Sequence, residues 1–395
     1  MNPVASILID NFNYAEFLPR SIESALGQTA GPLEVVVVDD ASTDSSPEVI
    51  RSYGDRIVPI LRPTNGGQGA AINAGFSASH GPVLLLLDAD DYLYPHAVET
   101  VLAHLRPGVS KVQYRLDLVD RDERRIDLYP PTEVRLDSGD VVPALLERGR
   151  YETPVTSGNA FPRSVLERIL PIPELDFRIA ADGYLVSAAP FYGPVVSIDR
   201  PLGGYRQHGK NAWSGDSAST SLDALAERLR RSLSHDELKY RIIAEEARRT
   251  AQKAHPAPGL RDPGHLTARL ASACLAPEAH PYASDARLGL CLRGLFHSWS
   301  AALPWGRRAA LASWFLAAGI LPRALARPAT AWMLAPVSRP VGVDRMLKLA
   351  RRLLRGGERP SPGVAQGRSR TRTSRSALRR SHPRRPPGRN REPSL

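Results

Sequence analysis

The chain has 395 residues, 42% of them hydrophobic, and carries a formal net charge of +11. This length exceeds that of one typical domain, so we expect two folded units with appendages, and the apolar content is enough for a sizeable core. With only Cys274 and Cys291, the composition argues against a disulfide framework and fits a reducing compartment.

The positive charge belongs to the C-terminal end of the chain. Residues 356–395 carry a net charge of +9 and residues 341–355 carry +4, which leaves −2 for residues 1–340. The first apolar run, at 5–9, is too short for a signal peptide and has no basic flank before it. No uncharged run reaches the ~20 apolar residues needed to span a bilayer. These features predict a cytoplasmic protein.

Short apolar runs alternate with helical patterns through the first hundred residues. The expected strands are 5–9, 33–38, 56–61 and 83–87, and the expected helices between them lie near 17–26, 46–52 and 69–78. Alternation at this spacing is typical of βαβ units with right-handed crossovers. The sequence therefore predicts the α/β class, with a mostly parallel open sheet flanked by helices.

Beyond residue 110 the pattern loosens, and helices come to dominate. We expect strands at 111–119 and 194–198, helices near 140–148 and from 163, a polar loop at 153–160, and a lone acid, Asp182, before another helix. The expected domains are an α/β domain at 1–216, a helical region at 217–340, a basic amphipathic helix at 341–355 and a disordered Arg-, Pro- and Ser-rich tail at 356–395.

Carboxylates follow two buried strands at the point where each strand ends. Asp39 and Asp40 close the second strand, while Asp88, Asp90 and Asp91 follow the run of leucines. The carboxyl ends of parallel strands meet at one edge of a sheet, where ligands of open α/β sheets bind. Oxygen-only ligands suit Mg²⁺ or Mn²⁺. A polar turn that caps the next helix is the alternative for the second group alone, but the two groups together favour a metal site.

A glycine-rich turn, Asn65-Gly66-Gly67, precedes the third helix. Asn-Gly-Gly is ordinary turn chemistry, and the segment has neither the spacing of a phosphate-binding P-loop nor that of a dinucleotide fingerprint. The small residues that follow would let a ligand approach the backbone closely.

Taken together, the ordered motifs over residues 3–211 resemble those of the family 2 glycosyltransferases, which have the GT-A fold. The motifs are 35–44 (VVVVDDASTD), 65–67 with Ala71 and 73–75, 87–91 (LDADD), Asp182, and 205–211 (YRQHGKN). Two departures are visible: Asp10-Asn11 stand where many members carry Pro-Thr, although Asn13 is retained, and Ala181 replaces the usual acidic neighbour of Asp182.

This resemblance implies roles for individual residues. Asp182 would be the catalytic base, and Asp90 with His208 would hold Mn²⁺ or Mg²⁺. The residues expected to bind the nucleotide sugar are Asp10, Asn13, Asp39, Asp40, Asn65, Gly66, Gly67, Asn73, Asp88 and Ala89. Asp39 would contact the base, and Asp88 the ribose or donor sugar. One base and no second nucleophile imply single displacement with inversion, from a nucleotide-diphosphate sugar to a hydroxyl acceptor in surface polysaccharide, glycolipid or glycan synthesis.

Two other functions fit parts of the sequence less well. A nucleotidyltransferase on a similar sheet would normally carry a Gly-rich basic segment after its first strand, whereas residues 10–13 contain neither Gly nor Lys. A non-catalytic polyanion-binding protein is suggested by the Arg-rich tail, but no nucleic-acid-binding fold precedes that tail.

The C-terminal end suggests a membrane contact. In residues 341–355 the apolar side chains fall close to one helix face with basic residues at its flanks, as in helices that lie on a membrane surface. The Arg-rich tail would add attraction to anionic lipid. The segment would then hold the enzyme peripherally at the inner face of the membrane. The alternative, left open here, is that 341–355 packs on the helical region and the tail is solvated.

Overall fold

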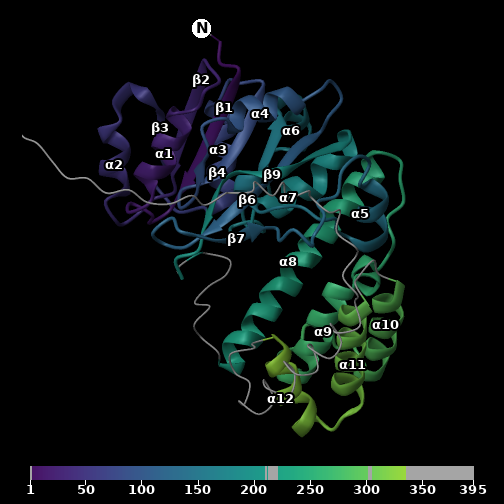
Figure 1. Ribbon diagram of the computed structural model, residues 1–395. Helices are drawn as coiled ribbons and strands as arrows, with labels where there is room; N and C mark the ends of the chain where they lie inside the picture. Colours follow the sequence, from purple (N-terminus) through teal and green to yellow (C-terminus); the bar gives the residue numbers. More distant parts are fainter. Residues whose placement is uncertain (1, 210, 212–220, 301–304, 335–395) are drawn as a thin grey trace, which may run out of the picture. The chain divides into compact units, whose positions relative to one another are not determined.

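A computed structural model describes residues 2–209, 211, 221–300 and 305–334 of the chain (Figure 1). The chain divides into two units, Met1–Asp344 and Arg345–Leu395, and the second unit lies wholly outside the described residues. The amphipathic helix expected at 341–355 and the tail expected at 356–395 therefore lie outside the described residues as well. The expected domain boundaries stay predictions.

Four N-terminal strands form the parallel part of the sheet. They are β1 (Ala5–Asn11), β2 (Leu33–Asp39), β3 (Val58–Leu61) and β4 (Val83–Asp88), arranged in the order β3-β2-β1-β4. The helices α1 (Leu18–Leu26), α2 (Ser46–Ser52) and α3 (Gln68–Ala78) connect them. The alternation read from the sequence is confirmed here, with each strand within two residues of its expected bounds.

The remaining strands turn the sheet into a mixed one. Beyond β4 the order continues with β8 (Asn159–Pro162), β6 (Lys111–Val119), β9 (Val195–Arg206) and β5 (Tyr92–Leu93), while β7 (Arg125–Tyr129) pairs with β6. Only β6 and β9 are parallel in this part; β8, β5 and β7 pair antiparallel with their neighbours. The α/β class is confirmed, but parallel pairing covers only part of the sheet. The expected polar loop at 153–160 partly forms β8, and the strand expected at 194–198 extends to Arg206.

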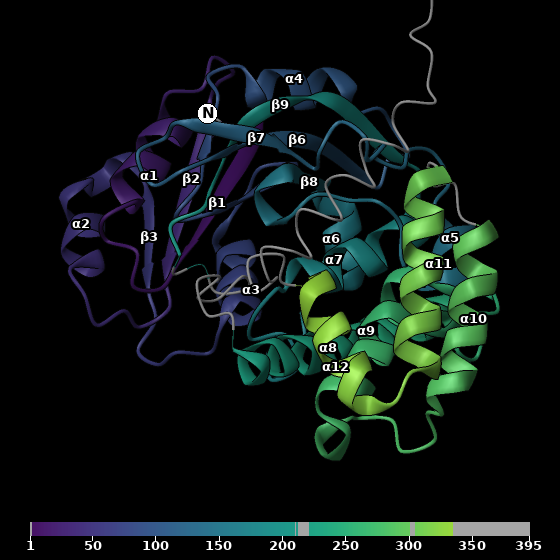
Figure 2. The same cartoon turned by 60° about the horizontal axis from the view of Figure 1, so that its bottom comes forward.

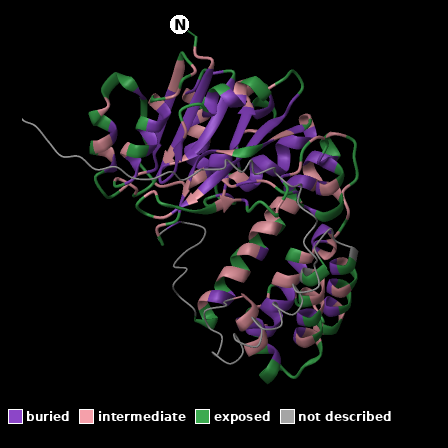
Figure 3. Ribbon diagram, viewed as in Figure 1, coloured by how far each residue is buried: buried purple, intermediate pink, exposed green. Residues whose placement is uncertain are grey.

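Helices cover both faces of the sheet because side chains alternate along its central strands. Ile7, Ile9, Leu85 and Leu87 pack in one core with α1, α2 and α4 (Ala97–His104). Leu8, Leu84 and Leu86 point the other way, into a second core with α3, α6 (Arg163–Ile169) and α7 (Asp182–Ala188). Figure 3 shows these strands as an almost continuous buried layer. Such a layer explains why the apolar runs read as fully buried strands.

The C-terminal part of the described chain is helical, as expected. It comprises α8 (Leu222–Arg249), α9 (Pro263–Leu275), α10 (Arg287–Ser300), α11 (Trp305–Ile320) and α12 (Arg323–Leu334). Ile243 and Ala247 of α8 pack with α5 (Val142–Arg148) and α7, while α9 to α12 share a separate core. Short 3-10 turns lie at Gly54–Arg56, Thr156–Gly158, Ala189–Tyr192, Pro258–Arg261 and Pro277–Ala279. None of the described helices is both long and apolar enough to cross a membrane.

Candidate active site

Two carboxylates meet where β1 and β4 end. Because these strands are parallel and in register, Asp10 lies directly opposite Asp88. Asp10 Oδ1 is buried and has no hydrogen-bond partner among the described residues. Burial raises the pKa of Asp10 to about 7, and nearby Asp90 and Asp182 add to that rise. Burial also raises the pKa of Asp88 well above its usual range, with Asp10 the strongest neighbouring charge.

The turn after β4 adds two more carboxylates. Asp88, Asp90 and Asp91 each offer one oxygen, and these oxygens lie within 4.8 Å of one another. Asp91 is anchored: its Oδ2 accepts from the Ser157 hydroxyl (2.6 Å), and its Oδ1 accepts from the Arg206 backbone N–H (2.9 Å). Ser157 Oγ also accepts from the Asp88 backbone N–H (3.1 Å). One serine thus holds both ends of the acidic turn.

His208 lies directly against Asp90. Its Nε2 is 3.0 Å from Asp90 Oδ2, and only 2% of its side chain is exposed. The ring lies edge-on to Tyr14 and packs against Phe17, with centroid distances of 5.4 and 4.6 Å. Asn211 Nδ2 donates to the same Asp90 oxygen (3.1 Å). The two residues expected to bind a metal are therefore brought together, and a cation held by both would replace their direct contact.

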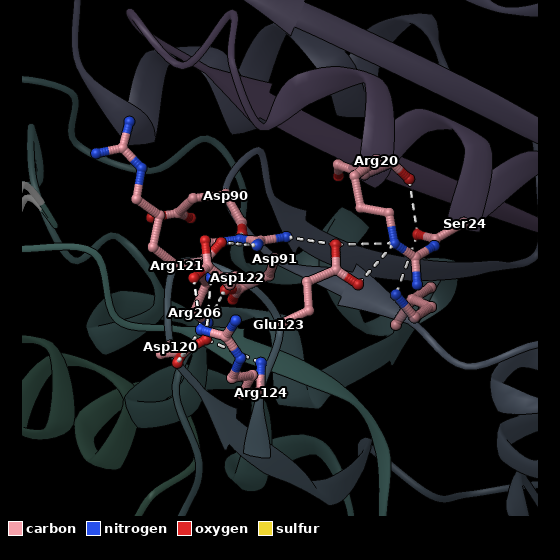
Figure 4. Close-up of polar contacts among 12 residues, drawn as sticks. Arg20, Ser24, Asp90, Asp91, Asp120, Arg121, Asp122, Glu123, Arg124 and Arg206 are labelled. Carbon is pink, nitrogen blue, oxygen red and sulfur yellow. Dashed lines mark hydrogen bonds and ion pairs between the residues drawn. The ribbon is translucent and has the colours of Figure 1, made fainter. Parts of the chain in front are cut away.

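Arg206 holds the acidic turn from the other side (Figure 4). Its Nε donates to the Asp90 carbonyl (2.8 Å), and its Nη2 donates to Glu123 (3.0 Å), which also pairs with Arg20. Its guanidinium lies 5.0 Å from the Phe17 ring centroid, and the residue is only 3% exposed. Sequence reasoning noted the motif that contains Arg206 but gave it no role. The only feature of the sequence that points to Arg206 is its charge within that motif.

Asp39, at the end of β2, and Asn13, which follows β1, both make hydrogen bonds that hold a loop. Asp39 accepts from Asn11 Nδ2 (2.7 Å) and from the Ser42 backbone N–H (3.0 Å). Asn13, at φ +60°, accepts from the Thr43 backbone N–H (2.7 Å). Both residues therefore fix the shape of residues 42–44 at the sheet edge.

Asp40 is occupied by the glycine-rich turn. Its carboxylate accepts from the backbone N–H groups of Gly66 (3.0 Å) and Gly67 (2.6 Å) and pairs with Arg62. Gly67 has φ +87°, and a Cβ there would lie 2.5 Å from Arg178 Cα. The small residues therefore make room for the chain at Phe177–Arg178, and the expected close approach of a ligand there stays a prediction.

Three further residues expected to bind the donor contact protein groups. Asn65 Oδ1 accepts from Arg178 Nη2 (2.6 Å), and Asn73 exchanges two hydrogen bonds with the Ile172 backbone (2.8 and 2.9 Å). The Ala89 side chain is fully buried, and its N–H donates to the Asp10 carbonyl (3.2 Å). Their roles in donor binding stay predictions.

Asp182 is the first residue of α7, and its charge acts on Asp10 and Asp88. We call the sheet edge that carries Asp10, Asp88, Asp90 and Asp91 the acidic edge. Burial raises its pKa, whereas the Gly183 N–H, Lys239 and Lys111 oppose that rise. Gln68 links Asp182 to the strand ends: its Nε2 donates to Asp88 Oδ1 (2.9 Å), and its Oε1 accepts from the Ala181 N–H (2.9 Å). Sequence reasoning missed Gln68, because an amide after a glycine turn carries no distinctive signal.

These residues fit a hard divalent cation. The turn after β4 offers carboxylate oxygens from the half-buried Asp88 and from the buried Asp90 and Asp91, and the unpartnered Asp10 oxygen lies in the same electrostatic cluster. Buried carboxylates at this density need either protons or a cation to be stable.

Residues 6–168 match the sequence model of a family described as glycosyl transferase family 2. An uncharacterized glycosyltransferase of Nostoc sp. is 38% identical over 222 residues, which cover 55% of this chain and 68% of that relative. The succinoglycan biosynthesis protein ExoO of Rhizobium meliloti is 29% identical over 217 residues, which cover 52% and 61%. A chondroitin synthase of Pasteurella multocida is 44% identical over 102 residues, which cover 25% of this chain and 11% of the synthase.

Solved structures of low sequence identity resemble the chain over most of its length. Residues 1–349 of TarS of S. aureus, in complex with UDP-GlcNAc, give a TM-score of 0.46 at 17% identity, covering 84% of this chain and 91% of that TarS fragment. The mannosyltransferase PcManGT of Pyrobaculum calidifontis, in complex with GDP-Man and Mn²⁺, has a TM-score of 0.44 at 18% identity, covering 85% and 86%.

Proposed function

Because this chain belongs to the family 2 glycosyltransferases, we propose that it moves a sugar from a nucleotide-diphosphate donor to a hydroxyl acceptor with inversion. It is a transferase, and its α/β fold is of the GT-A class expected from the motifs. One observation carries the proposal: carboxylates from three separate segments, at Asp10, Asp88–Asp91 and Asp182, converge on one sheet edge. Family membership decides against the nucleotidyltransferase and the non-catalytic alternatives.

Asp90 would hold Mg²⁺ or Mn²⁺, with His208 as a further ligand, and Asp88 would contact the ribose or the donor sugar. The bound ion would supply positive charge beside the leaving diphosphate. Asp91 would act differently, since both of its oxygens are engaged by Ser157 and Arg206. Its role would be to fix the turn that presents Asp90.

The nucleoside would lie along the edge shaped by Asp39 and Asn13. The hydrogen bonds of these residues to Asn11, Ser42 and Thr43 support a rigid loop there. Asp40, Asn65 and the two glycines would contribute by shaping the neighbouring wall, and Asn73 and Ala89 by bracing what lies behind it.

Asp182 would accept the proton of the acceptor hydroxyl. The new bond forms between the acceptor oxygen and the anomeric carbon, while the bond from that carbon to the diphosphate oxygen breaks. A carboxylate whose pKa is raised by burial is a stronger base than one in water, which suits this task. With one base and no second nucleophile, a single displacement inverts the anomeric configuration.

The acceptor would be a glycan or a lipid-linked sugar. Relatives named for succinoglycan biosynthesis and for chondroitin synthesis support a role in polysaccharide synthesis, including that of the cell envelope. A lipid-linked acceptor would also account for the peripheral membrane contact proposed for 341–395, which lies outside the described residues.

A donor screen tests the proposal. Full-length protein is incubated with UDP- and GDP-sugars and Mn²⁺, and the nucleotide product is identified by chromatography, with Asp182→Asn as the control. Release of a nucleoside diphosphate by the wild type but not by the variant supports glycosyl transfer. Release of a nucleoside monophosphate or of pyrophosphate from every active donor would overturn it.

A further inference from the structure

Two neighbouring helices expose stripes of large apolar side chains. On α10, Leu288, Leu292, Phe296 and Trp299 are between 56% and 71% exposed. At about 100° of helix rotation per residue, these four residues fall within about 80° of one another. A one-sided apolar stripe of this width normally faces a core.

A second stripe lies on α11. Trp305, Leu316 and Ile320 are 65%, 44% and 62% exposed, and they fall within about 60° around the helix. Leu321 and Leu325, just beyond α11, are also exposed. Nine of the large hydrophobic residues that the described part of the chain exposes therefore lie between 288 and 325.

The sides of α10 and α11 that face the core do not carry these exposed residues. Leu290 and Cys291 of α10 are buried with Phe315 and Ala318 of α11. A Cβ on Gly294 would lie 2.1 Å from the Phe315 ring, so the helices pack in close contact, side by side in Figures 1 and 2. The two stripes therefore lie on sides of α10 and α11 that do not face this shared core.

The charge on the segment that carries these stripes has a single sign. Residues 286–343 contain seven Arg and no Asp or Glu, whereas residues 1–285 contain 38 Asp and Glu against 29 Lys and Arg. Arg287 is used within the fold, since it donates to the carbonyls of Ala318 and Leu321. Arg293, Arg323 and Arg327 are exposed. Any surface that covers the stripes therefore meets cations and no anions from these helices.

We propose that the α10–α11 face, defined by the two stripes above, docks onto an anionic phospholipid bilayer. Lipid offers apolar chains to the stripes and phosphate to the arginines. Tryptophan is favoured at that boundary because it combines an apolar body with a polar N–H, which fits Trp299 and Trp305.

Charge disfavours the two other candidate occupants. Residues 341–395 carry +13, so electrostatic repulsion would oppose the docking of this segment on an arginine-bearing face. A second copy of the chain would place arginines opposite arginines with no acid from these helices between them. The proposal does not depend on the transfer reaction, because it concerns a surface and not the acidic edge.

Vesicle flotation with the full-length chain tests the proposal. The variant Leu292→Gln/Trp299→Gln removes stripe area without changing net charge, so the contribution of the basic tail is kept. The matched control, Ile126→Gln/Leu175→Gln, alters two residues of the α/β part that are 58% and 89% exposed. A second stripe variant, Leu316→Gln/Ile320→Gln, tests α11. Thermal melts verify that each variant is folded.

We expect the wild type and the control to float with vesicles containing phosphatidylglycerol but not with phosphatidylcholine alone. The bound fraction should fall about tenfold in either folded stripe variant. Equal binding by wild type and both stripe variants would overturn the proposal, as would the absence of wild-type binding. A dimer in solution that the stripe changes dissociate, with vesicle binding unchanged, would assign the face to a second copy instead.

Discussion

The acidic edge of the sheet and the α10–α11 face are opposites in composition and in burial. At the edge, Asp10, Asp88 and Asp91 are held in a buried environment that raises the pKa of each. On the helical face, apolar side chains are exposed among arginines, and residues 286–343 contain no acid. Each arrangement is unfavourable for the protein alone.

This contrast shows which partner each region needs. Buried carboxylates are stabilised by a cation, and a nucleoside diphosphate can follow that cation into the site. Exposed apolar stripes beside cations are stabilised by an anionic apolar surface. The chain's net charge of +11 conceals this division, because acids and bases are segregated along the sequence.

The largest effect is expected at Asp90. Asp90→Ala removes a proposed cation ligand past the strand end, so transfer should fall by a factor on the order of 10³ while the fold persists. Initial rates of nucleoside diphosphate release measure this. The control is Asp55→Ala, which removes an exposed acid from the same α/β part. Full activity of Asp90→Ala, or of the wild type in excess chelator, would refute the proposed metal site.

The next effect concerns Asp182. Asp182→Asn should lower turnover on the order of 10²-fold and leave donor affinity nearly unchanged, because the amide cannot accept the proton. The raised pKa of Asp182 means that its basic form appears only as the pH rises, so wild-type turnover should increase with pH across that titration. Calorimetric donor binding and a pH–rate profile measure the two parts. Weakened donor binding with unchanged turnover would make Asp182 a binding residue.

A smaller effect is expected at Gln68, and it should distinguish this side chain from Asn73 on the same helix, α3. Gln68→Ala removes the hydrogen bonds to Asp88 and to the Ala181 N–H, so kcat/KM should fall roughly tenfold. Asn73→Ala breaks hydrogen bonds to the Ile172 backbone and to the Glu174 carboxylate, none of which involves the carboxylates at the strand ends, so it should lower stability with less change in kcat/KM. If the Asn73 variant loses more activity at equal stability, Asn73 binds the donor directly.

The smallest effect is expected at His235 on α8, whose ring packs edge-on against Phe177. Burial and Lys239 lower the pKa of His235 to about 4, so the folded state favours the neutral ring. The stabilisation that the neutral His235 ring gives the folded state is fully present above the ordinary histidine pKa of about 6.5. It is lost as the pH falls toward 4. Urea unfolding should show a loss on the order of 2 kcal/mol in that window. His235→Gln should remove this part of the pH dependence, and an unchanged slope in the variant would contradict the account.

Prediction from sequence succeeded where burial was simple. Strands β1, β2 and β4 are buried on both faces, so apolar runs and the acids that end them were enough to locate the sheet edge. The four-residue β8 lies within a polar segment, and β5 has two residues, so neither carries a periodic signal. Gln68, Ser157 and Arg206 act through contacts across distant segments, which spacing along the chain cannot reveal. The role of Gly67 likewise depends on where residue 178 folds.

Binding of Mn²⁺ tests the central claim, that the acidic edge is a cation site for a nucleotide donor, most directly. Isothermal titration of the full-length protein in the presence of UDP or GDP would compare the wild type with Asp90→Asn, a change that keeps the side chain's shape. The account predicts one Mn²⁺ site in the wild type, with affinity at least about tenfold lower in the variant. Equal affinity in both proteins, or no Mn²⁺ binding by the wild type with either nucleotide, would contradict it.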